Sequence, residues 1–99
     1  MNITFINGDI EIGDEEKAKV ESRLRIALSR YSSKVARLTV KLSVTDDNDH
    51  KKCRIELFLR PTRKIVVEDA DSDLEAAIDR AAAQVARSVE RKLRREREN

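Results

Sequence analysis

The middle of the chain alternates apolar and polar residues with a period of two, which is typical of strands with one buried and one solvated face. The alternation runs from residue 38 to 45 and again from 53 to 60, on either side of the polar loop 46–50. Pro61 and Thr62 then make a tight connection into a third alternating segment at about 63–69. The pattern predicts three consecutive antiparallel strands.

Two longer segments carry apolar residues at helical spacing. The first spans residues 14–31, with Gly13-Asp14 at its start and acidic residues in its first turn. The second begins after Asp71 or Ser72 as N-cap and has arginines near its end. The buried stripes expected on the two helices are Val20, Leu24, Ala27, Leu28 and Tyr31, and Leu74, Ile78, Ala81, Val85 and Val89.

Residues 2–6 alternate like a short strand before the turn signal Asn7-Gly8-Asp9, so the predicted order is βαβββα. A right-handed crossover through the first helix makes the first two strands parallel if they are neighbours. Both helices must then cover the one apolar face of the sheet. We expect an α/β fold, a two-layer sandwich with a four-stranded mixed sheet and two helices on one face, like a double-stranded-RNA-binding domain.

The composition limits what this fold can do. With 99 residues, of which 40% are charged and 39% apolar, the chain is expected to form a single domain over residues 1–99. So small a core leaves little room for a deep active site, and three aromatic residues without Trp argue against a base-stacking platform of the RRM or OB type. One cysteine, no signal-peptide pattern and no long apolar stretch predict a cytoplasmic protein without a membrane partner.

The net charge of +2 conceals alternating acidic and basic blocks. Residues 1–22 carry a net charge of −4 and residues 23–37 a net charge of +5. Residues 38–70 are nearly balanced at +1, whereas residues 71–79 carry −4 and residues 80–99 carry +4. The local electrostatic potential, more than the net charge, should therefore decide which partners bind.

The basic residues fall on one side of each predicted helix. On the second helix, four arginines lie roughly 200° to 260° from Leu74, almost opposite the core stripe. They are Arg80, Arg87, Arg91 and Arg94. The alternative for this helix is a solvated face with pairs such as Glu90 to Arg94.

The first helix carries a second basic edge beside its buried stripe. This edge comprises Lys19, Arg23 and Arg30, with Lys34 and Arg37 following in the connection to the next strand. If the helices pack side by side, the two edges form one concave basic surface that fits a structured RNA by shape and charge. Two unrelated solvated faces are the alternative.

Signals for catalysis and for metal or cofactor binding are weak. The chain has one His and one Cys, too few for a nucleophile with a converging base, so we expect no enzyme and no cofactor. Cys53 points inward on its strand as a small buried apolar residue. The acidic loop 46–49 begins like a calcium loop, but position six is not Gly and position twelve is Leu57. A solvated turn without metal is the better interpretation.

Several segments in this order resemble the ribosome hibernation promoting factor family, which includes the ribosome-associated inhibitor proteins. They are DLEAAID at 73–79 with the trailing arginines, IEI at 10–12, ALSRY at 27–31 and KKCR at 51–54, the last as in a divergent branch. The chain departs from common family residues at Ala27, Glu75 and Gln84. Because it stops at Asn99, it resembles the short form without the C-terminal domain that pairs ribosomes.

The resemblance implies a hibernation factor of slow growth, stress or stationary phase that regulates translation. Such a factor occupies the channel of the small ribosomal subunit where mRNA and tRNA would bind, and it does not act on DNA. The residues expected by position to contact rRNA are Arg23, Arg30, Arg87, Arg91, Arg94 and Arg95. The alternative is a protein-interaction module in which the same arginines bind an acidic protein partner and RNA has no role.

Overall fold

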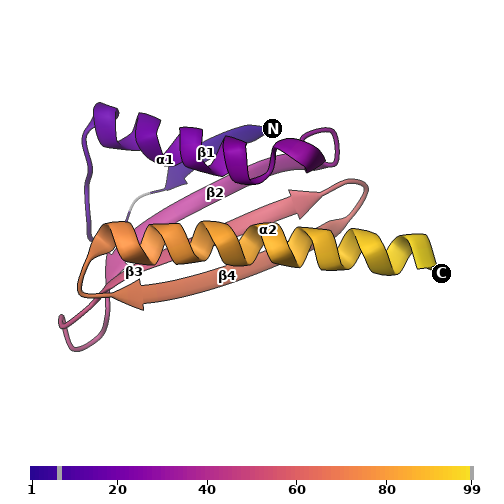
Figure 1. The fold of residues 1–99 in the computed structure, drawn as a ribbon. Helices are drawn as coiled ribbons and strands as arrows, with labels where there is room; N and C mark the ends of the chain where they lie inside the picture. The colour runs from indigo at the N-terminus through magenta and orange to yellow at the C-terminus, as the bar shows by residue number, and fades with distance from the viewer. Residues whose placement is uncertain (7, 99) are drawn as a thin grey trace.

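The structure is a computed structural model that describes residues 1–6 and 8–98, with side chains up to residue 96. Its element order is the predicted βαβββα (Figure 1). The elements are β1 (Asn2–Ile6), α1 (Asp14–Ala27), the 3₁₀ turn η1 (Ser29–Tyr31), β2 (Val35–Val44), β3 (Lys51–Leu59), β4 (Arg63–Asp71) and α2 (Leu74–Glu98).

The strands form one mixed sheet in the order β1-β2-β3-β4. β1 pairs with β2 in parallel, as the crossover through α1 requires, and the other two pairs are antiparallel. Both helices lie on the same face of the sheet and leave the other face open (Figure 1). The predicted two-layer fold is therefore confirmed.

The core lies between the sheet and the helices. Alternate residues of β2 and β3 point into it, for example Leu38 and Leu57, which are both completely buried. Leu24 and Leu28 come down from the α1 side. On α2 the small residues Ala77, Ala81 and Ala82 and the branched Val85 and Val89 are buried, so this helix can lie close to the strands.

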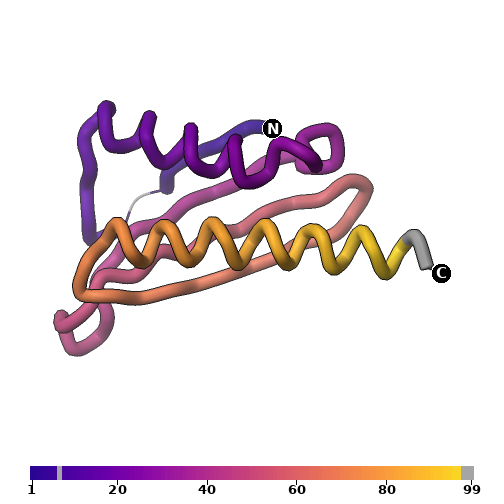
Figure 2. Tube along the Cα trace, viewed as in Figure 1, coloured from indigo at the N-terminus to yellow at the C-terminus, as the bar shows by residue number. Residues whose placement is uncertain are grey.

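The molecule is elongated, at 44 × 26 × 19 Å, and different helix ends and turns lie at its two ends. The start of α1, the β2–β3 loop and the β4–α2 turn lie at one end, which we call the acidic end (Figure 2). The end of α1 with η1, the β3–β4 turn and the end of α2 lie at the other, which we call the basic end (Figure 2). This arrangement sets the charge pattern described below.

The predicted end of the first helix is wrong. α1 ends at Ala27, and Leu28 leaves the helical region with φ −109° and ψ 11° before η1. A tighter 3₁₀ turn is common at a helix C-terminus. Here it redirects the chain into β2 while Leu28 stays fully buried and Tyr31 packs partly against the core.

The predicted N-cap of the second helix is also corrected. β4 continues to Asp71, which pairs with Lys51, so the helix starts later than the pattern suggested. Asp73 is the residue whose Oδ1 accepts the backbone N–H of Glu75, at 3.2 Å. Asp71 instead accepts the N–H of Asp73, at 2.9 Å, and so closes the turn before the cap.

The strands are longer than their alternation alone indicates. β2 begins at Val35, which pairs with Leu59, and a register irregularity lies between Val35 and Arg37.

In the predicted turn after β1, Asn7 lies outside the described residues. Gly8 packs against the carbonyl of Leu42, where a Cβ atom would overlap it. No helix of the described part of the chain has the length and apolar character needed to cross a membrane.

Candidate nucleic-acid interface

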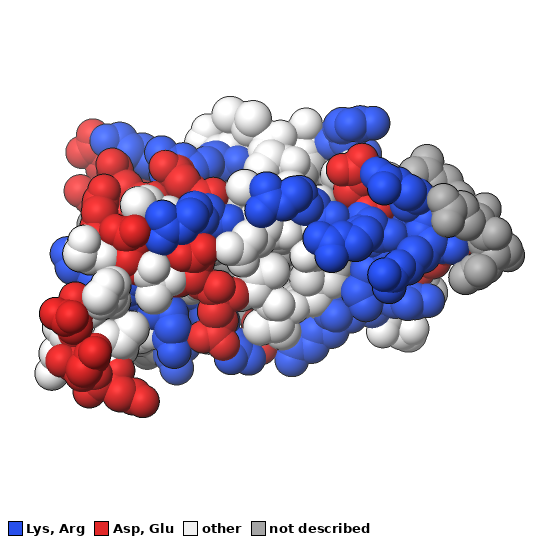
Figure 3. Space-filling view, turned by 60° about the horizontal axis from the view of Figure 1, so that its bottom comes forward, with Lys and Arg blue, Asp and Glu red and all other residues white. Residues whose placement is uncertain are grey.

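Charge is separated along the long axis of the molecule. Figure 3 shows Lys and Arg gathered toward the basic end and Asp and Glu gathered toward the acidic end. The three acids in the first turn of α1 and the loop 46–49 account for part of the negative end. A polyanion such as RNA would therefore be attracted to one end and repelled from the other.

The two helices are connected by an ion pair at their exposed edges. Nη1 of Arg23 on α1 lies 2.8 Å from Oδ1 of Asp79 on α2. Both side chains are more than a third exposed, so water and salt screen the attraction. The pair shows that the basic edge of α1 faces α2, as the two-stripe interpretation requires.

Two adjoining hollows bring five of the predicted cations together. Arg30, Tyr31, Ser33 and Lys34 line one side of the larger hollow, and Glu90, Leu93 and Glu96 of α2 line the other, enclosing about 460 Å³. The smaller hollow, of about 170 Å³, is lined by Arg87, Glu90, Arg91 and Arg94. Glu90 lines both. The two hollows therefore adjoin at Glu90, and we call their five cations, at the basic end, the basic cleft: Arg30, Lys34, Arg87, Arg91 and Arg94.

Not all of these cations are equally available. Nη2 of Arg94 lies 3.0 Å from Oε1 of Glu90, the pair expected for a solvated helix face. Arg87 and Arg91 make no ion pair with any side chain that the structure describes. An arginine without a carboxylate partner can give its whole donor fork to a phosphate. Arg87 and Arg91, like Arg30, are therefore better phosphate-binding candidates than Arg94.

The structure adds a basic residue that the helix pattern missed. The backbone N–H of Arg60, in the β3–β4 turn, donates to the carbonyl of Lys34 at 2.8 Å. This bond joins the turn to the α1–β2 connection and brings exposed Arg60 next to the basic cleft. A basic residue beside the tight Pro61 turn was the available signal, but only the packing of the sheet shows which end of the molecule the turn occupies.

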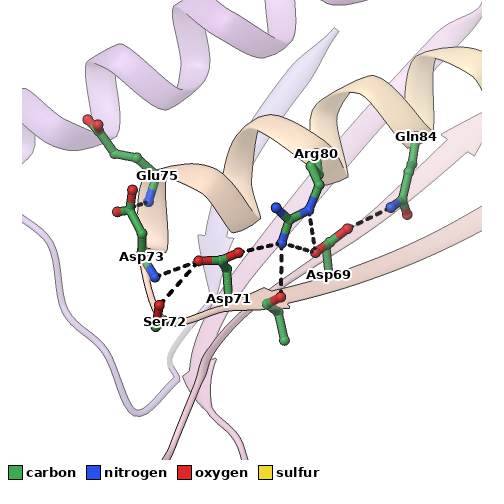
Figure 4. A network of polar contacts seen from close by, with 8 residues as sticks. Asp69, Asp71, Ser72, Asp73, Glu75, Arg80 and Gln84 are labelled. Carbon is green, nitrogen blue, oxygen red and sulfur yellow. Dashed lines mark hydrogen bonds and ion pairs between the residues drawn. The ribbon is translucent and has the colours of Figure 1, made fainter.

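Arg80 belongs to a different environment from the other arginines of α2. Its guanidinium donates to Asp69 and Asp71 of β4, with ion-pair distances of 2.9 Å to each, and to the carbonyl of Ala70 at 3.0 Å (Figure 4). Gln84 donates to the same Asp69 at 2.7 Å. These bonds tie the first turns of α2 to the edge strand.

The electrostatic effect of this network is mutual. Hydrogen bonds from Arg80 hold the pKa of Asp69 below its ordinary value, and the N–H of Asp73 together with Arg80 does the same for the pKa of Asp71. The pKa of Arg80 is raised by both carboxylates. Its inclusion in the open arginine stripe is therefore corrected, because the acids come from β4 and not from the helix.

Arg37 lies on the opposite side of the sheet from the helices. The prediction placed it in the connection, but β2 already begins at Val35, and Leu38 points into the core. Arg37 therefore faces away from the helices, where its Cζ lies 4.1 Å from the ring centroid of Phe58. It cannot form part of one concave surface with the basic cleft.

The two remaining predicted residues are exposed on the helices. Lys19 lines a shallow hollow on α1 with Ser22, Arg23 and Ile26, away from the basic end. Ile26 is 73% exposed there. Arg95 is exposed near the end of α2. Lys19 thus lies apart from the basic cleft, whereas Arg95 follows Arg94 along α2 at the basic end.

The structure gives little basis for catalysis. Cys53 is completely buried, and burial raises the pKa of its thiol to about 12. Asp47 accepts hydrogen bonds from the Thr45 hydroxyl and the Asp49 N–H, which lower its pKa and close the loop on itself. Within the described residues, no group of His, Cys, Asp and Glu side chains could hold a metal ion.

Comparison with known proteins identifies relatives over nearly the whole chain. The profile of the family described as sigma 54 modulation protein / S30EA ribosomal protein matches residues 1–97. A comparison with curated protein sequences found no match.

Solved structures agree with this match. The Protein Y N-terminal domain of Thermus thermophilus is similar, with a TM-score of 0.74 and 32% identity, covering 92% of this chain and 98% of that domain. A ribosomal subunit interface protein from Coxiella burnetii has a TM-score of 0.72 with 12% identity, covering 92% of this chain and 93% of that one, a likeness of fold alone. The resemblance seen in the sequence is thereby confirmed: the chain belongs to the sigma 54 modulation protein / S30EA ribosomal protein family of ribosome-associated factors.

Proposed function

We propose that this protein is a non-enzymatic hibernation factor that binds rRNA of the small ribosomal subunit in the mRNA and tRNA channel. The observation that carries the proposal is the basic cleft, in which the hollow lined by Arg30 and Lys34 adjoins, at Glu90, the hollow lined by Arg87, Arg91 and Arg94. Family membership supports the ribosome as the partner. Occupying the channel would block translation during slow growth, stress or stationary phase in the cytoplasm.

The chemistry of the cleft suits a folded RNA. Planar guanidinium groups bind phosphate oxygens in pairs, and they also stack on bases. The cleft contains few aromatic rings, so binding would depend on phosphates and on the shape of the RNA more than on base sequence. Such binding forms no covalent bond and weakens in salt, so release needs no chemical step.

The charge separation supports a fixed orientation. With acids gathered at one end of a 44 Å long molecule, rotation by half a turn would bring like charges against RNA phosphates. That repulsion disfavours the reversed orientation, while the basic end is drawn in. The basic end therefore enters the RNA surface first, and the acidic end remains toward solvent or toward a protein.

Cosedimentation with purified small subunits tests the proposal. The charge reversal Arg87→Glu with Arg91→Glu should weaken binding by about tenfold or more, because two phosphate contacts become repulsive. The matched control is Arg25→Glu with Lys51→Glu, the same change in net charge at exposed positions outside the cleft and outside the open face of the sheet. The control should bind nearly as well as the original chain. Unchanged binding of the arginine double variant would refute the site.

An acidic protein partner is a second candidate. It is favoured by one observation, that arginines at the basic end already bind carboxylates, as in Arg94 with Glu90 and Arg63 with Glu96, each at 3.0 Å. RNase treatment of a cell lysate separates the two candidates. If association with ribosomal particles is lost after treatment, RNA is the partner. If the protein stays bound to a protein after the RNA is gone, the second candidate holds.

A further inference from the structure

On the open face of the sheet, all four strands contribute a polar, cationic or aromatic side chain to a single register row. Asn2 of β1 is opposite Arg37 of β2, Arg37 is opposite Phe58 of β3, and Phe58 is opposite Lys64 of β4. These four residues, which we call the sheet row, alternate along their strands with buried Ile3, Leu38, Leu57 and Ile65, so they lie on the side away from the helices. They combine an amide, a guanidinium, an aromatic ring and an ammonium group.

The middle of the sheet row is built around Phe58. Cζ of Arg37 lies over the ring, 4.1 Å from its centroid, and Nζ of Lys64 lies 5.6 Å from the same centroid. Such cation–ring contacts are attractive within about 6 Å. Phe58 is only half-buried, and Arg37 is exposed. The ring therefore supports the guanidinium from below and leaves its outer side toward solvent.

Arg37 is also free of acidic partners. The two carboxylates of this face, Glu56 and Glu68, are bound by other cations: Glu56 by Arg54 at 2.9 Å and by Lys64 at 3.4 Å, and Glu68 by Arg54 at 3.2 Å and by Lys52 at 3.3 Å. Arg37 makes no ion pair with the side chains that the structure describes. Its charge and its planar surface are therefore available to a ligand.

The charge of the whole face favours an anion. Among the described strand residues that point to this side, five are cationic and two are acidic. They are Arg37, Lys41, Lys52, Arg54 and Lys64, against Glu56 and Glu68. The exposed apolar side chains Ile6 and Val66 lie in other rows of the register. The sheet row thus offers no exposed aliphatic side chain to an apolar protein surface, but it offers two cations to the phosphates of a nucleic acid.

We propose that the sheet row binds one nucleotide of a single-stranded RNA, on the opposite side of the molecule from the basic cleft. The base stacks on the outer side of the Arg37 guanidinium, which Phe58 holds in place. Lys64, whose half-exposed ammonium group also pairs with Glu56, binds the adjoining phosphate, and the amide of Asn2 hydrogen-bonds to the edge of the base. This site goes beyond the proposed function, which uses only the helix side.

The position of the sheet row allows one RNA strand to contact both the sheet row and the basic cleft. The row contains the first residues of β2 and β4 and the end of β3, so it lies at the basic end. The bond between Arg60 and Lys34 marks the same end on the helix side. An RNA strand that leaves the basic cleft can thus pass around this end of the protein onto the open face of the sheet without crossing the acidic end.

Fluorescence anisotropy with a labelled, unstructured single-stranded RNA of about twelve nucleotides tests this site. Arg37→Lys keeps the charge but loses the plane that stacks, so it should raise the Kd about tenfold. Phe58→Leu should raise it by a similar factor without changing charge. The control Lys41→Arg, a conservative exchange on the same face, should stay within about twofold. Thermal unfolding of each variant checks that the fold is retained.

The result that overturns the inference is an oligonucleotide affinity unchanged in Arg37→Lys. Phe58 also contributes to packing, and Phe58→Leu can fail to fold for that reason alone. In that case the affinity of Arg37→Lys is the deciding measurement. Ultraviolet crosslinking of the same RNA should give crosslinked peptides from β2 or β3. Crosslinks confined to α2 would also contradict the site. Because the proposed function is tested with small subunits and the variants at Arg87 and Arg91, either proposal can fail while the other stands.

Discussion

The salt dependence of ribosome binding gives a quantitative test of the basic cleft. Neutralising phosphates releases counterions, so the logarithm of the binding constant falls with the logarithm of salt by about 0.7 to 0.9 for each phosphate contact. If each of the five cleft cations contacts one phosphate, the slope for the original chain is about −3.5 to −4.5. Arg87→Gln with Arg91→Gln removes two contacts and should make it shallower by about 1.4 to 1.8.

Arg80 provides the internal control for this argument. Arg80→Gln removes the same charge from the same helix as Arg87→Gln does. Arg80 is nevertheless bound to Asp69 and Asp71, each at 2.9 Å, and its guanidinium is directed at β4. Arg87→Gln should therefore reduce the slope by about 0.7 to 0.9, whereas Arg80→Gln should leave it nearly unchanged.

The assay is anisotropy of labelled protein titrated with small subunits between about 50 and 200 mM potassium chloride, a range in which slopes of this size are resolved. Equal losses of slope in the Arg80 and Arg87 variants would show that only overall charge matters. A slope unchanged in the double variant would show that the cleft does not contact phosphates. Either result would refute the assignment of the site.

Three further predictions concern the fold and its titrating groups. Gly8→Ala should destabilise the protein by about 1–3 kcal/mol in urea unfolding, because the added Cβ would overlap a carbonyl of β2; an unchanged midpoint would contradict the close approach. Cys53, fully buried with its pKa raised to about 12, should resist a thiol reagent at pH 8 in the native protein and react fully in denaturant. The pKa values of Asp69 and Asp71 lie below the ordinary 3.8 in the folded protein, so their stabilisation is present above pH 3.8 and is lost as pH falls through the folded values. The unfolding midpoint should fall more steeply below pH 3.8 in the original chain than in Arg80→Gln, and parallel curves would contradict the network.

The order and faces of the elements could be predicted because they follow from local rules. A period of two or of 3.6 residues shows which side of a strand or helix is apolar, and burial of Leu38, Leu57, Val85 and Val89 agrees with it. The ends of elements depend on pairing and turns instead. β4 extends to Asp71 because Lys51 pairs with it, and that extension moves the helix cap to Asp73.

The candidate site could be predicted only as two basic edges. The sequence by itself determined that Arg87 and Arg91 lie opposite the core stripe of α2, since helical spacing decides the face. It could not show which side chains from other elements come near that face. Contacts between residues far apart in the sequence arise from how layers pack, and no local pattern encodes them.

Three outcomes were decided by the tertiary structure. Packing of α2 beside β4 gave Arg80 two carboxylate partners, and an early start of β2 turned Arg37 to the open face. The position of η1 beside the end of α2 placed Arg30 in a hollow that adjoins the hollow of Arg87 and Arg91, because Glu90 lines both. The physical reason is common to all three: the charge of an arginine is set by its own chemistry, but its availability is set by neighbours that only the folded chain supplies.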